Sequence, residues 1–551
     1  MKDRPTPKAQ TGSDPSPIEL IGRPASSGLA LGPLAAVVLG QARQRTPGDP
    51  AHETVALVTS IEASIADIEA LSLKVGGAGA DMLEFQTAML GDATLRAPAL
   101  AAIAAGEPAE RAWAAALTEH INGYIAAEDE HFRARANDLA DMRDRVLRRL
   151  TGVASSQIVI PKGAIIAADD MTPSQFLETD WSGGGGLMLV AGSPSSHVAM
   201  LARSRGVPMV VGLGSLPIDG HTAAMIDGDL GRVVLSPGAA ERKAFASGRQ
   251  LEDARRQTEQ SSLARPALTA DGIGIAVLAN ISDPEELTHI DPTICDGVGL
   301  FRTELMFRDG KPLPDEEAQY HAYRACLRWA GKKPVTIRTL DIGGDKPIRG
   351  LTPVGESNPF LGSRGIRLTL AQPDLFRVQL RALARAAVHG NLKVMLPMVT
   401  LPSEHATASQ LLEDVIVELG REGTPCQRPP LGIMIEVPAA AIMASSFTKA
   451  AFFSIGSNDL TQYVMAASRD TPAVASFGEG APEAVLRLMA GTVAAAGQLG
   501  IEVSLCGDMA SETALLPRLL ATGIRTLSVA PAAIGRVKAA VSQLVIGAGY
   551  G

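Results

Sequence analysis

The first part of the chain has apolar residues at helical spacing. Over residues 51–74 they recur at steps of three and four, which is the pattern of an amphipathic helix. A second helix is predicted near 82–90, and a third helical stretch over about 110–150, where similar spacing continues. Residues from about 45 to 150 are therefore predicted to form a helical module.

After this module the apolar runs become short and are separated by glycine and proline. Five strands are predicted, at 157–160, 186–190, 208–211, 223–226 and 232–235. They indicate a compact mixed α/β domain over residues 21–238 that includes the helical module. A polar, charge-rich stretch follows and stops before Pro266, which predicts a linker helix over 239–265.

Beyond Pro266 the chain alternates between apolar runs and helical patterns. The eight strand candidates lie at 273–278, 297–301, 335–339, 392–397, 432–435, 452–455, 502–505 and 526–529. Eight alternations of this size predict a (β/α)8 barrel over residues 266–551, whose active site would gather at the carboxyl ends of the strands. The predicted fold class is therefore α/β, with a C-terminal barrel preceded by an α/β domain that carries a helical module.

Composition narrows the possible functions. The formal charge of -9 argues against a protein that coats nucleic acid, because that work needs clustered lysine and arginine. The four cysteines are widely spaced without a CxxC pair, which favours a reducing cytoplasm over a disulfide framework or a zinc site. No uncharged apolar stretch reaches membrane-spanning length, and residues 1–20, polar and proline-rich, are predicted to be a disordered tail.

The negative charge is concentrated in the helical module. Residues 51–150 hold 16 acidic and nine basic side chains, a net of -7. Solvated helix faces and a surface that attracts a basic partner are both consistent with this excess.

Two arginines follow predicted barrel strands. Arg302 and Arg338 would each offer a planar pair of donors to a phosphate or carboxylate oxygen. An arginine taken alone is more often a surface or ion-pair residue, but two at matching barrel positions favour an anionic ligand. The glycine-containing loop over residues 341–346 ends in Lys346, which would add positive charge, and a plain turn is the alternative.

Other strand ends carry carboxylates and a thiol. Glu436 and Asp459 are hard oxygen ligands of the kind that hold Mg²⁺ beside substrate phosphates, and an ion pair with one of the arginines is the alternative. Cys506 ends the seventh predicted strand, where its thiol could donate a proton to a substrate. A lone buried cysteine is otherwise a small apolar filler.

His197 lies in the α/β domain, in the run Gly-Ser-Pro-Ser-Ser-His over residues 192–197. The hydroxyls of Ser195 and Ser196 can cap a helix that begins there. His197 would then lie in the first helical turn, where free amides favour an arriving phosphoryl group. It is a candidate nucleophile, although any single histidine is more often structural.

These residues resemble a known family, the phosphoenolpyruvate-protein phosphotransferases, or enzyme I of the bacterial sugar phosphotransferase system. The resemblance covers about residues 21–540, and its most specific pieces are Asn-Pro-Phe-Leu-Gly-Ser-Arg over 358–364 and Ser-Ile-Gly-Ser-Asn-Asp-Leu-Thr-Gln-Tyr over 454–463. It implies that His197 is phosphorylated, that the helical module docks the histidine-containing phosphocarrier protein HPr, and that the barrel binds phosphoenolpyruvate, Mg²⁺ and a second subunit.

The resemblance also implies roles for individual residues of the barrel. Glu436 and Asp459 would bind Mg²⁺, Cys506 would protonate the leaving group, and pyruvate would be released. Substrate binding would fall to a larger set: Arg302, Arg338, Asn458, Asp459 and Arg469, with Arg364 and Lys346 as additions.

The chain departs from the family pattern at several places, among them a short, glycine-rich carboxyl end over 541–551 and an amino-terminal extension of twenty residues. Ser193, Pro194 and Ser195 replace the usual residues before His197, and residues 476–482 lack the usual His-Pro step. Two rival functions share some of these features. A pyruvate dikinase or phosphoenolpyruvate synthase needs a large nucleotide-binding domain for which this chain has no room, and a regulatory paralogue without turnover is disfavoured because all the catalytic residue types are present.

Overall fold

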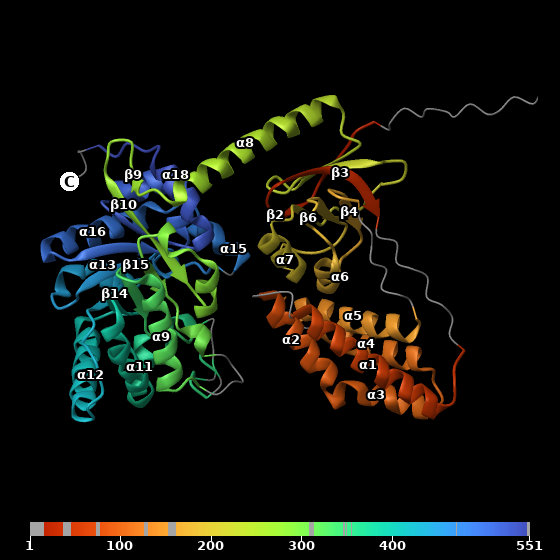
Figure 1. The fold of residues 1–551 in the computed structure, drawn as a ribbon, viewed down its shortest axis with the longest axis horizontal. Coiled ribbons are helices and arrows are strands. Elements are labelled where there is room, and N and C mark those ends of the chain that lie inside the picture. Colours follow the sequence, from red (N-terminus) through yellow and green to blue (C-terminus); the bar gives the residue numbers. More distant parts are fainter. Residues whose placement is uncertain are drawn as a thin grey trace, which may run out of the picture. The chain divides into compact units, whose positions relative to one another are not determined.

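The computed structural model describes residues 16–36, 46–72, 78–125, 130–152, 161–194, 196–307, 313–344, 348, 350–353, 355–469 and 471–547. The chain forms two compact units, Met1–Glu252 and Asp253–Gly551 (Figure 1). Most of the predicted N-terminal tail, residues 1–15, lies outside the described residues. The prediction of a tail up to residue 20 is wrong at its end, because strand β1 (Ile18–Ile21) pairs with strand β8 (Arg232–Leu235).

The first unit is built on an eight-stranded mixed sheet in the order β1-β8-β7-β3-β4-β5-β6-β2. Its other strands are β2 (Arg23–Ser26), β3 (Leu29–Ala36), β4 (Ile165–Ala168), β5 (Gly186–Leu189), β6 (Met209–Val211) and β7 (Ala223–Asp227). Four of the predicted strands correspond to β5 to β8, and the one predicted at 157–160 lies outside the described residues. Strands β3 to β6 pair in parallel, and the remaining pairs are antiparallel.

The helical module consists of α1 (Pro50–Ser72), α2 (Ala78–Gly91), α3 (Ala93–Ala104), α4 (Ala109–Ile125) and α5 (Glu130–Leu150). Its core is one continuous cluster with the α/β part of the unit, and includes Leu57, Ile61 and the fully buried Trp113. Helix α3 was not predicted, because its alanine-rich sequence with Pro98 has little periodic contrast. Helices α6 (Pro173–Glu178) and α7 (His197–Arg205) lie between the module and the sheet (Figure 1).

Helix α8 (Ala239–Leu263) occupies the range where the linker helix was predicted, and the division between the two units falls within it. Its end is attached to the second unit by a buried lysine. Lys538 Nζ donates to the carbonyl oxygens of Leu263 at 2.8 Å and of Arg265 at 2.9 Å. These bonds satisfy carbonyls that a helix end leaves without partners.

The second unit is a closed parallel barrel. Its eight strands are β10 (Gly274–Ile281), β11 (Val298–Phe301), β12 (Val335–Arg338), β13 (Leu392–Leu396), β14 (Leu431–Ile435), β15 (Phe452–Gly456), β16 (Glu502–Cys506) and β17 (Thr526–Val529). Strand β10 pairs with both β11 and β17, which closes the ring, and β9 (Ala267–Leu268) adds an antiparallel edge. All eight predicted strands are present.

Helices connect and surround these strands. They are α9 (Glu316–Ala330), α10 (Ile366–Ala371), α11 (Pro373–Ala386), α12 (Pro402–Arg421), α13 (Pro438–Ile442), α14 (Ser457–Met465), α15 (Pro472–Ala475), α16 (Glu483–Leu499), α17 (Leu516–Ala521) and α18 (Ile534–Val541). No helix within the described ranges of either unit is long and apolar enough to cross a membrane.

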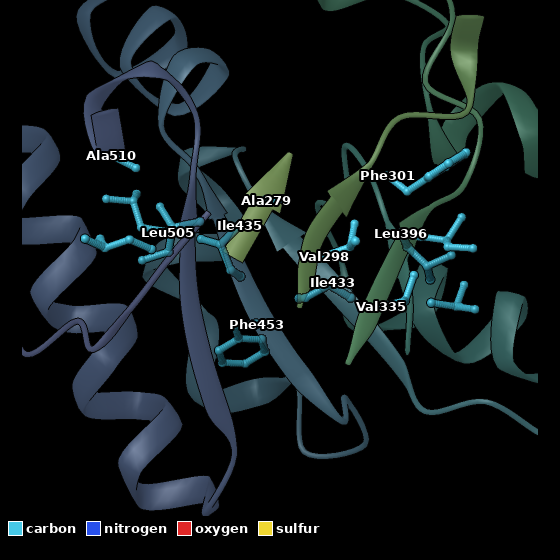
Figure 2. Close-up of a cluster of buried hydrophobic side chains, with 14 of the residues drawn as sticks. Ala279, Val298, Phe301, Val335, Leu396, Ile433, Ile435, Phe453, Leu505 and Ala510 are labelled. Carbon is cyan, nitrogen blue, oxygen red and sulfur yellow. The ribbon is translucent and has the colours of Figure 1, made fainter. Parts of the chain in front are cut away.

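Successive strand residues point to opposite sides of the barrel wall. Ile433, Ile435 and Leu505 belong to the large cluster between strands and helices, part of which is shown in Figure 2. The alternate residues Met434 and Cys506 belong to a separate small cluster with Leu300, Met395 and Phe452. The two clusters divide the outward from the inward positions, so Cys506 points into the barrel.

Candidate functional site

His197 is the first residue of helix α7. The helix is capped by Ser196, whose Oγ accepts a hydrogen bond from the amide of Ala199 at 3.2 Å. The predicted placement of His197 in the first helical turn is therefore confirmed, while Ser195 lies outside the described residues. The imidazole lies where free backbone amides and the helix dipole favour a negative group.

The imidazole is oriented by a carboxylate that sequence reasoning missed. His197 Nδ1 lies 3.1 Å from Asp138 Oδ1, on helix α5 of the helical module. The Asp138 side chain is fully buried, whereas a quarter of the His197 side chain is exposed. Because a carboxylate accepts a hydrogen bond, the proton of a neutral imidazole is held on Nδ1, and Nε2 keeps its lone pair.

The loop before His197 is held by two arginines. Arg23 donates to the carbonyl oxygen of Gly192 at 3.0 Å, and Arg203 donates to that of Pro194 at 2.9 Å. The Ser196 amide donates to the carbonyl of Ser193 at 3.0 Å. The loop that departs from the family pattern is therefore held by hydrogen bonds from two arginines outside it and from one of its own amides.

Asp138 is the first of three polar residues that connect α5 to α6 and α7. One turn further along, Asp141 Oδ2 accepts from Gln86 Nε2 at 3.2 Å and from the amide of Ser174 at 3.4 Å. A further turn along, Arg145 pairs with Glu178 at 2.7 Å. These contacts fix the position of α5, and therefore of Asp138, against the domain that carries His197.

The barrel site is a dense network of buried charges at the strand ends. The Arg338 guanidinium pairs with Glu304 and, at 3.0 Å, with Asp341. The Arg364 guanidinium bridges two carboxylates, with bonds of 3.0 and 3.1 Å to Asp341 and two bonds of 3.1 Å to Asp459. The alternative interpretation, an ion pair with an arginine, therefore describes Asp459 in this structure.

Burial alone would lower the pKa of both arginines, but their carboxylate partners outweigh it. Glu304 and Asp341 raise the pKa of Arg338 well above its usual range, and Asp341 and Asp459 do the same for Arg364. Both guanidinium groups therefore stay charged. Sequence reasoning did not assign a role to Glu304 or Asp341, because the sequence does not indicate which carboxylates lie next to an arginine in the fold.

Glu436 differs from the other three carboxylates because it accepts a hydrogen bond from a backbone amide. Its Oε1 accepts from the amide of Met398 at 2.5 Å. Met398 has a φ of 56°, a left-handed conformation that costs a residue other than glycine about 1 kcal/mol or more. Burial, followed by repulsion from Asp459 and Asp341, raises the pKa of Glu436 to about 8.

The chemistry of these groups fits a divalent cation. Within the described residues, no group of three or more His, Cys, Asp or Glu side chains is arranged to hold a metal ion by itself. Glu304, Asp341, Glu436 and Asp459 nevertheless outnumber the guanidinium groups of Arg338 and Arg364, and all six are buried. Mg²⁺ is commonly bound by one or two carboxylates together with substrate phosphates. Glu436 and Asp459 are suited to that role.

Cys506 points into the barrel beneath these charges. Its thiol donates to the carbonyl of Ile455 at 3.4 Å and accepts from Ser454 Oγ at 3.3 Å. Burial raises the pKa of the thiol, so it remains protonated at neutral pH. Gly507 follows at a φ of 116°, and a Cβ there would lie 2.2 Å from Ser457 Oγ, which requires glycine.

The remaining predicted site residues are placed less centrally. Asn458 exchanges two 3.0 Å hydrogen bonds with Asp508, one to its side chain and one from its backbone amide. Arg302 follows strand β11 directly, and its charge acts on the Cys506 thiol. Arg469 is exposed beyond the end of α14, and Lys346 lies outside the described residues.

The fold and these two sites define a class of protein. One unit presents a histidine at a helix start, and the other is a parallel barrel with arginines and carboxylates at its strand ends. Three family models match the chain: the PEP-binding domain of PEP-utilising enzymes over residues 256–546, their N-terminal domain over 21–135, and their mobile domain over 160–231.

Curated relatives carry the assignment further. The phosphoenolpyruvate-protein phosphotransferase of Haloferax volcanii is 38% identical, over 85% of this chain and 83% of that protein. The protein of the same name from Priestia megaterium is 34% identical, over 88% of this chain and 89% of that one. The chain belongs to the phosphoenolpyruvate-protein phosphotransferase family.

A longer relative matches nearly the whole chain. The multiphosphoryl transfer protein of Rhodobacter capsulatus is 37% identical over 94% of this chain. The chain spans 63% of the length of that protein.

Proposed function

We propose that the protein transfers the phosphoryl group of phosphoenolpyruvate to His197, releases pyruvate, and passes the group to a histidine-containing phosphocarrier protein, HPr. The observation that carries this proposal is the His197 imidazole at a helix start, with Nδ1 held by Asp138 and Nε2 left as a nucleophile. Family membership supports the same reaction.

In this reaction His197 Nε2 attacks phosphorus, and the bond from phosphorus to the enolate oxygen breaks. The leaving enolate takes a proton from the Cys506 thiol on its methylene carbon and becomes pyruvate, after which the thiolate regains a proton from water. The orientation and protonation of that thiol support the role. Transfer of this kind depends mainly on positioning and charge neutralisation.

The barrel would supply that neutralisation. Arg302, Arg338 and Arg364 would hold the anion, and Glu436 with Asp459 would hold Mg²⁺, which neutralises phosphate charge when it is bound. Further contacts would come from Asn458, Arg469 and Lys346. Because Arg338 and Arg364 already pair with carboxylates, the substrate would enter a network whose donors are fixed before it arrives.

The partners follow from the same proposal. The helical module, with its net charge of -7, would dock the phosphocarrier protein, and the barrel unit would form a homodimer. His197 and the barrel residues belong to different units, so the His197 domain would move between substrate and carrier. The free cysteines support a reducing compartment, the cytoplasm.

The test is incubation of the full-length protein with labelled phosphoenolpyruvate and Mg²⁺. The wild type should acquire acid-labile label and release pyruvate, and His197→Ala should acquire none while still binding phosphoenolpyruvate. His221→Ala is the matched control. This histidine lies in the same unit, and its Nδ1 is 2.9 Å from an uncharged hydroxyl oxygen, Ser236 Oγ. Label that persists in His197→Ala, or is absent from the wild type, would overturn the proposal.

A further inference from the structure

The segment from Glu356 to Arg364 leads into the barrel site and contains the motif Asn-Pro-Phe-Leu-Gly-Ser-Arg. We refer to residues 356–364 as the Arg364 loop. Within it, the Leu361 amide donates to the carbonyl of Asn358 at 2.9 Å, and the Ser363 amide donates to Glu356 Oε1 at 2.9 Å. Such short-range bonds, to which the Gly362 amide adds one to the Pro359 carbonyl at 3.2 Å, do not fix where the loop lies on the barrel.

The position of the loop is set by side chains outside it. Three successive carbonyl oxygens are held: that of Phe360 accepts from Tyr463 Oη at 2.5 Å, and those of Leu361 and Gly362 accept from Arg367 Nη1 at 3.2 and 3.3 Å. The other Arg367 nitrogen, Nη2, donates to Thr400 Oγ1 at 3.2 Å, which anchors that guanidinium to the barrel.

Tyr463 and Asp459 lie one turn apart on helix α14. Asp459 binds the Arg364 guanidinium with both oxygens, and Tyr463 binds the backbone four residues earlier, at Phe360. A single rigid helix thus holds the Arg364 loop at two points. The Arg364 guanidinium also lies against the Phe360 ring, with its central carbon 6.0 Å from the ring centroid.

The tyrosine is a permanent donor in this arrangement. Burial is the main cause that raises the pKa of Tyr463 to about 12. The phenol therefore stays protonated throughout the neutral range, and the hydrogen bond to Phe360 does not depend on pH there.

We propose that Tyr463 and Arg367 are positioning residues of the anion site, which hold the backbone of the Arg364 loop so that Arg364 is presented in a fixed place to phosphoenolpyruvate. The inference rests on the proposed function. Neither residue touches the reacting atoms in this role. Arg364 would bind ground state and transition state alike, so a displaced loop should weaken substrate binding more than it slows turnover.

The experiment compares Tyr463→Phe with Tyr320→Phe in the full-length protein. Tyr320 is a control on helix α9, because its hydroxyl likewise takes part in a short hydrogen bond, at 2.8 Å to His389 Nε2. Tyr463→Phe should raise the KM for phosphoenolpyruvate by about three- to tenfold, the effect of one lost hydrogen bond, and leave kcat within about twofold. Tyr320→Phe should leave both constants unchanged.

A second variant tests the other anchor. Arg367→Met should raise KM in the same way, and Arg367→Lys should restore part of the affinity, because a lysine can still donate to one of the two carbonyls. If Tyr463→Phe does not fold, this pair decides the matter by itself.

The outcomes separate the two proposals. A wild type that is not phosphorylated contradicts the proposed function. A functional wild type whose Tyr463→Phe and Arg367→Met variants match Tyr320→Phe in KM, or lose kcat at unchanged KM, contradicts the positioning role.

Discussion

His197 and the barrel site differ in how deeply their polar and charged side chains are buried. His197 has one oriented contact, to Asp138, and a quarter of its side chain is exposed. In the barrel, two guanidinium groups and four carboxylates are all buried, and three of the carboxylates form ion pairs with the guanidinium groups. A partly exposed nucleophile leaves an open approach for a reacting group, whereas donors fixed in advance favour the binding of an anion.

The same difference appears in the elements that build each site. The His197 site combines residues of α5 and α7 that meet through the contact of Asp138 with His197, and further polar contacts join α5 to α2 and α6. The barrel site is supported by the closed ring of strands, with a continuous core between strands and helices. Both arrangements also rest on apolar packing, because the helical module and the α/β part of the first unit share one core.

The largest expected effect is on the stability of the barrel. Arg338→Met should lower its free energy of unfolding by about 3–5 kcal/mol, because the buried Glu304 and Asp341 would both lose the positive charge of Arg338, and Asp341 would keep Arg364. Calorimetry of the full-length protein would measure this. Arg377→Met, which breaks a partly exposed pair with Glu418, is the control and should cost about 1 kcal/mol or less. Equal losses would mean that the barrel charges are not a coupled network.

The next effect separates binding from proton delivery. Cys506→Ala should lower turnover by roughly a hundredfold, the contribution of a general acid, and leave phosphoenolpyruvate affinity within about threefold. Exchange of the pyruvate methyl hydrogens with deuterated water should be lost in parallel. Cys326→Ala is the control, because this buried cysteine lies on helix α9 in the cluster outside the barrel. A variant that exchanges like the wild type would make Cys506 a packing residue.

At the other site, Asp138→Asn should slow phosphorylation of His197 by roughly tenfold to a hundredfold, because the imidazole loses its fixed orientation. Phosphoenolpyruvate binding by the barrel should not change. Asp144→Asn is a control on the same helix, since the Asp144 side chain is about half exposed and forms an ion pair with the adjacent Arg143. An unaffected rate in Asp138→Asn would mean that the helix start alone orients His197.

A further effect, spread over several pH units, is a pH dependence of stability that the buried site should show. The folded-state pKa of Glu436, about 8, lies above the ordinary value of 4.5, so the folded protein binds this proton more tightly than the unfolded chain. The stabilising contribution is therefore complete below about pH 4.5 and is lost as pH rises towards 8, at up to about 1.4 kcal/mol per pH unit.

Thermal unfolding without divalent cations checks this prediction. Glu436→Gln should remove the loss of stability between about pH 5 and pH 8, and Mg²⁺ should restore more stability to the wild type at pH 8 than at pH 6. A wild-type melting temperature that follows that of Glu436→Gln across this range would contradict the assigned pKa direction.

The eight barrel strands could be predicted because each is a short apolar run between helical patterns, and strand order in such a barrel follows chain order. The start of α7 could be predicted because Ser196 is a local cap. Strand β1 was not predicted. It has only four residues, of which Glu19 and Ile21 are exposed, and its partner strand is more than 200 residues away in the sequence. Local pattern carries no information on such pairings.

The residues of the candidate site likewise fall into two groups, those that the local sequence predicts and those that it does not. The residue types at the strand ends, such as Arg338, Glu436 and Cys506, were evident from their positions after apolar runs. Their partners were not, because Glu304, Asp341 and Tyr463 acquire their roles from side chains that meet only in the closed barrel. The period of two along each strand was a usable signal, since it separates inward residues such as Met434 and Cys506 from outward ones.

The sequence by itself determined the eight barrel strands and the start of α7, because hydrophobic period and capping residues act over a few neighbouring positions. It also determined the chemistry available at the strand ends. Only the tertiary structure decided that Asp138 orients His197, that Arg364 bridges Asp341 and Asp459, and that Glu436 is crowded by other carboxylates. Distances between charges depend on which elements pack together, and electrostatic energies change steeply with those distances and with burial.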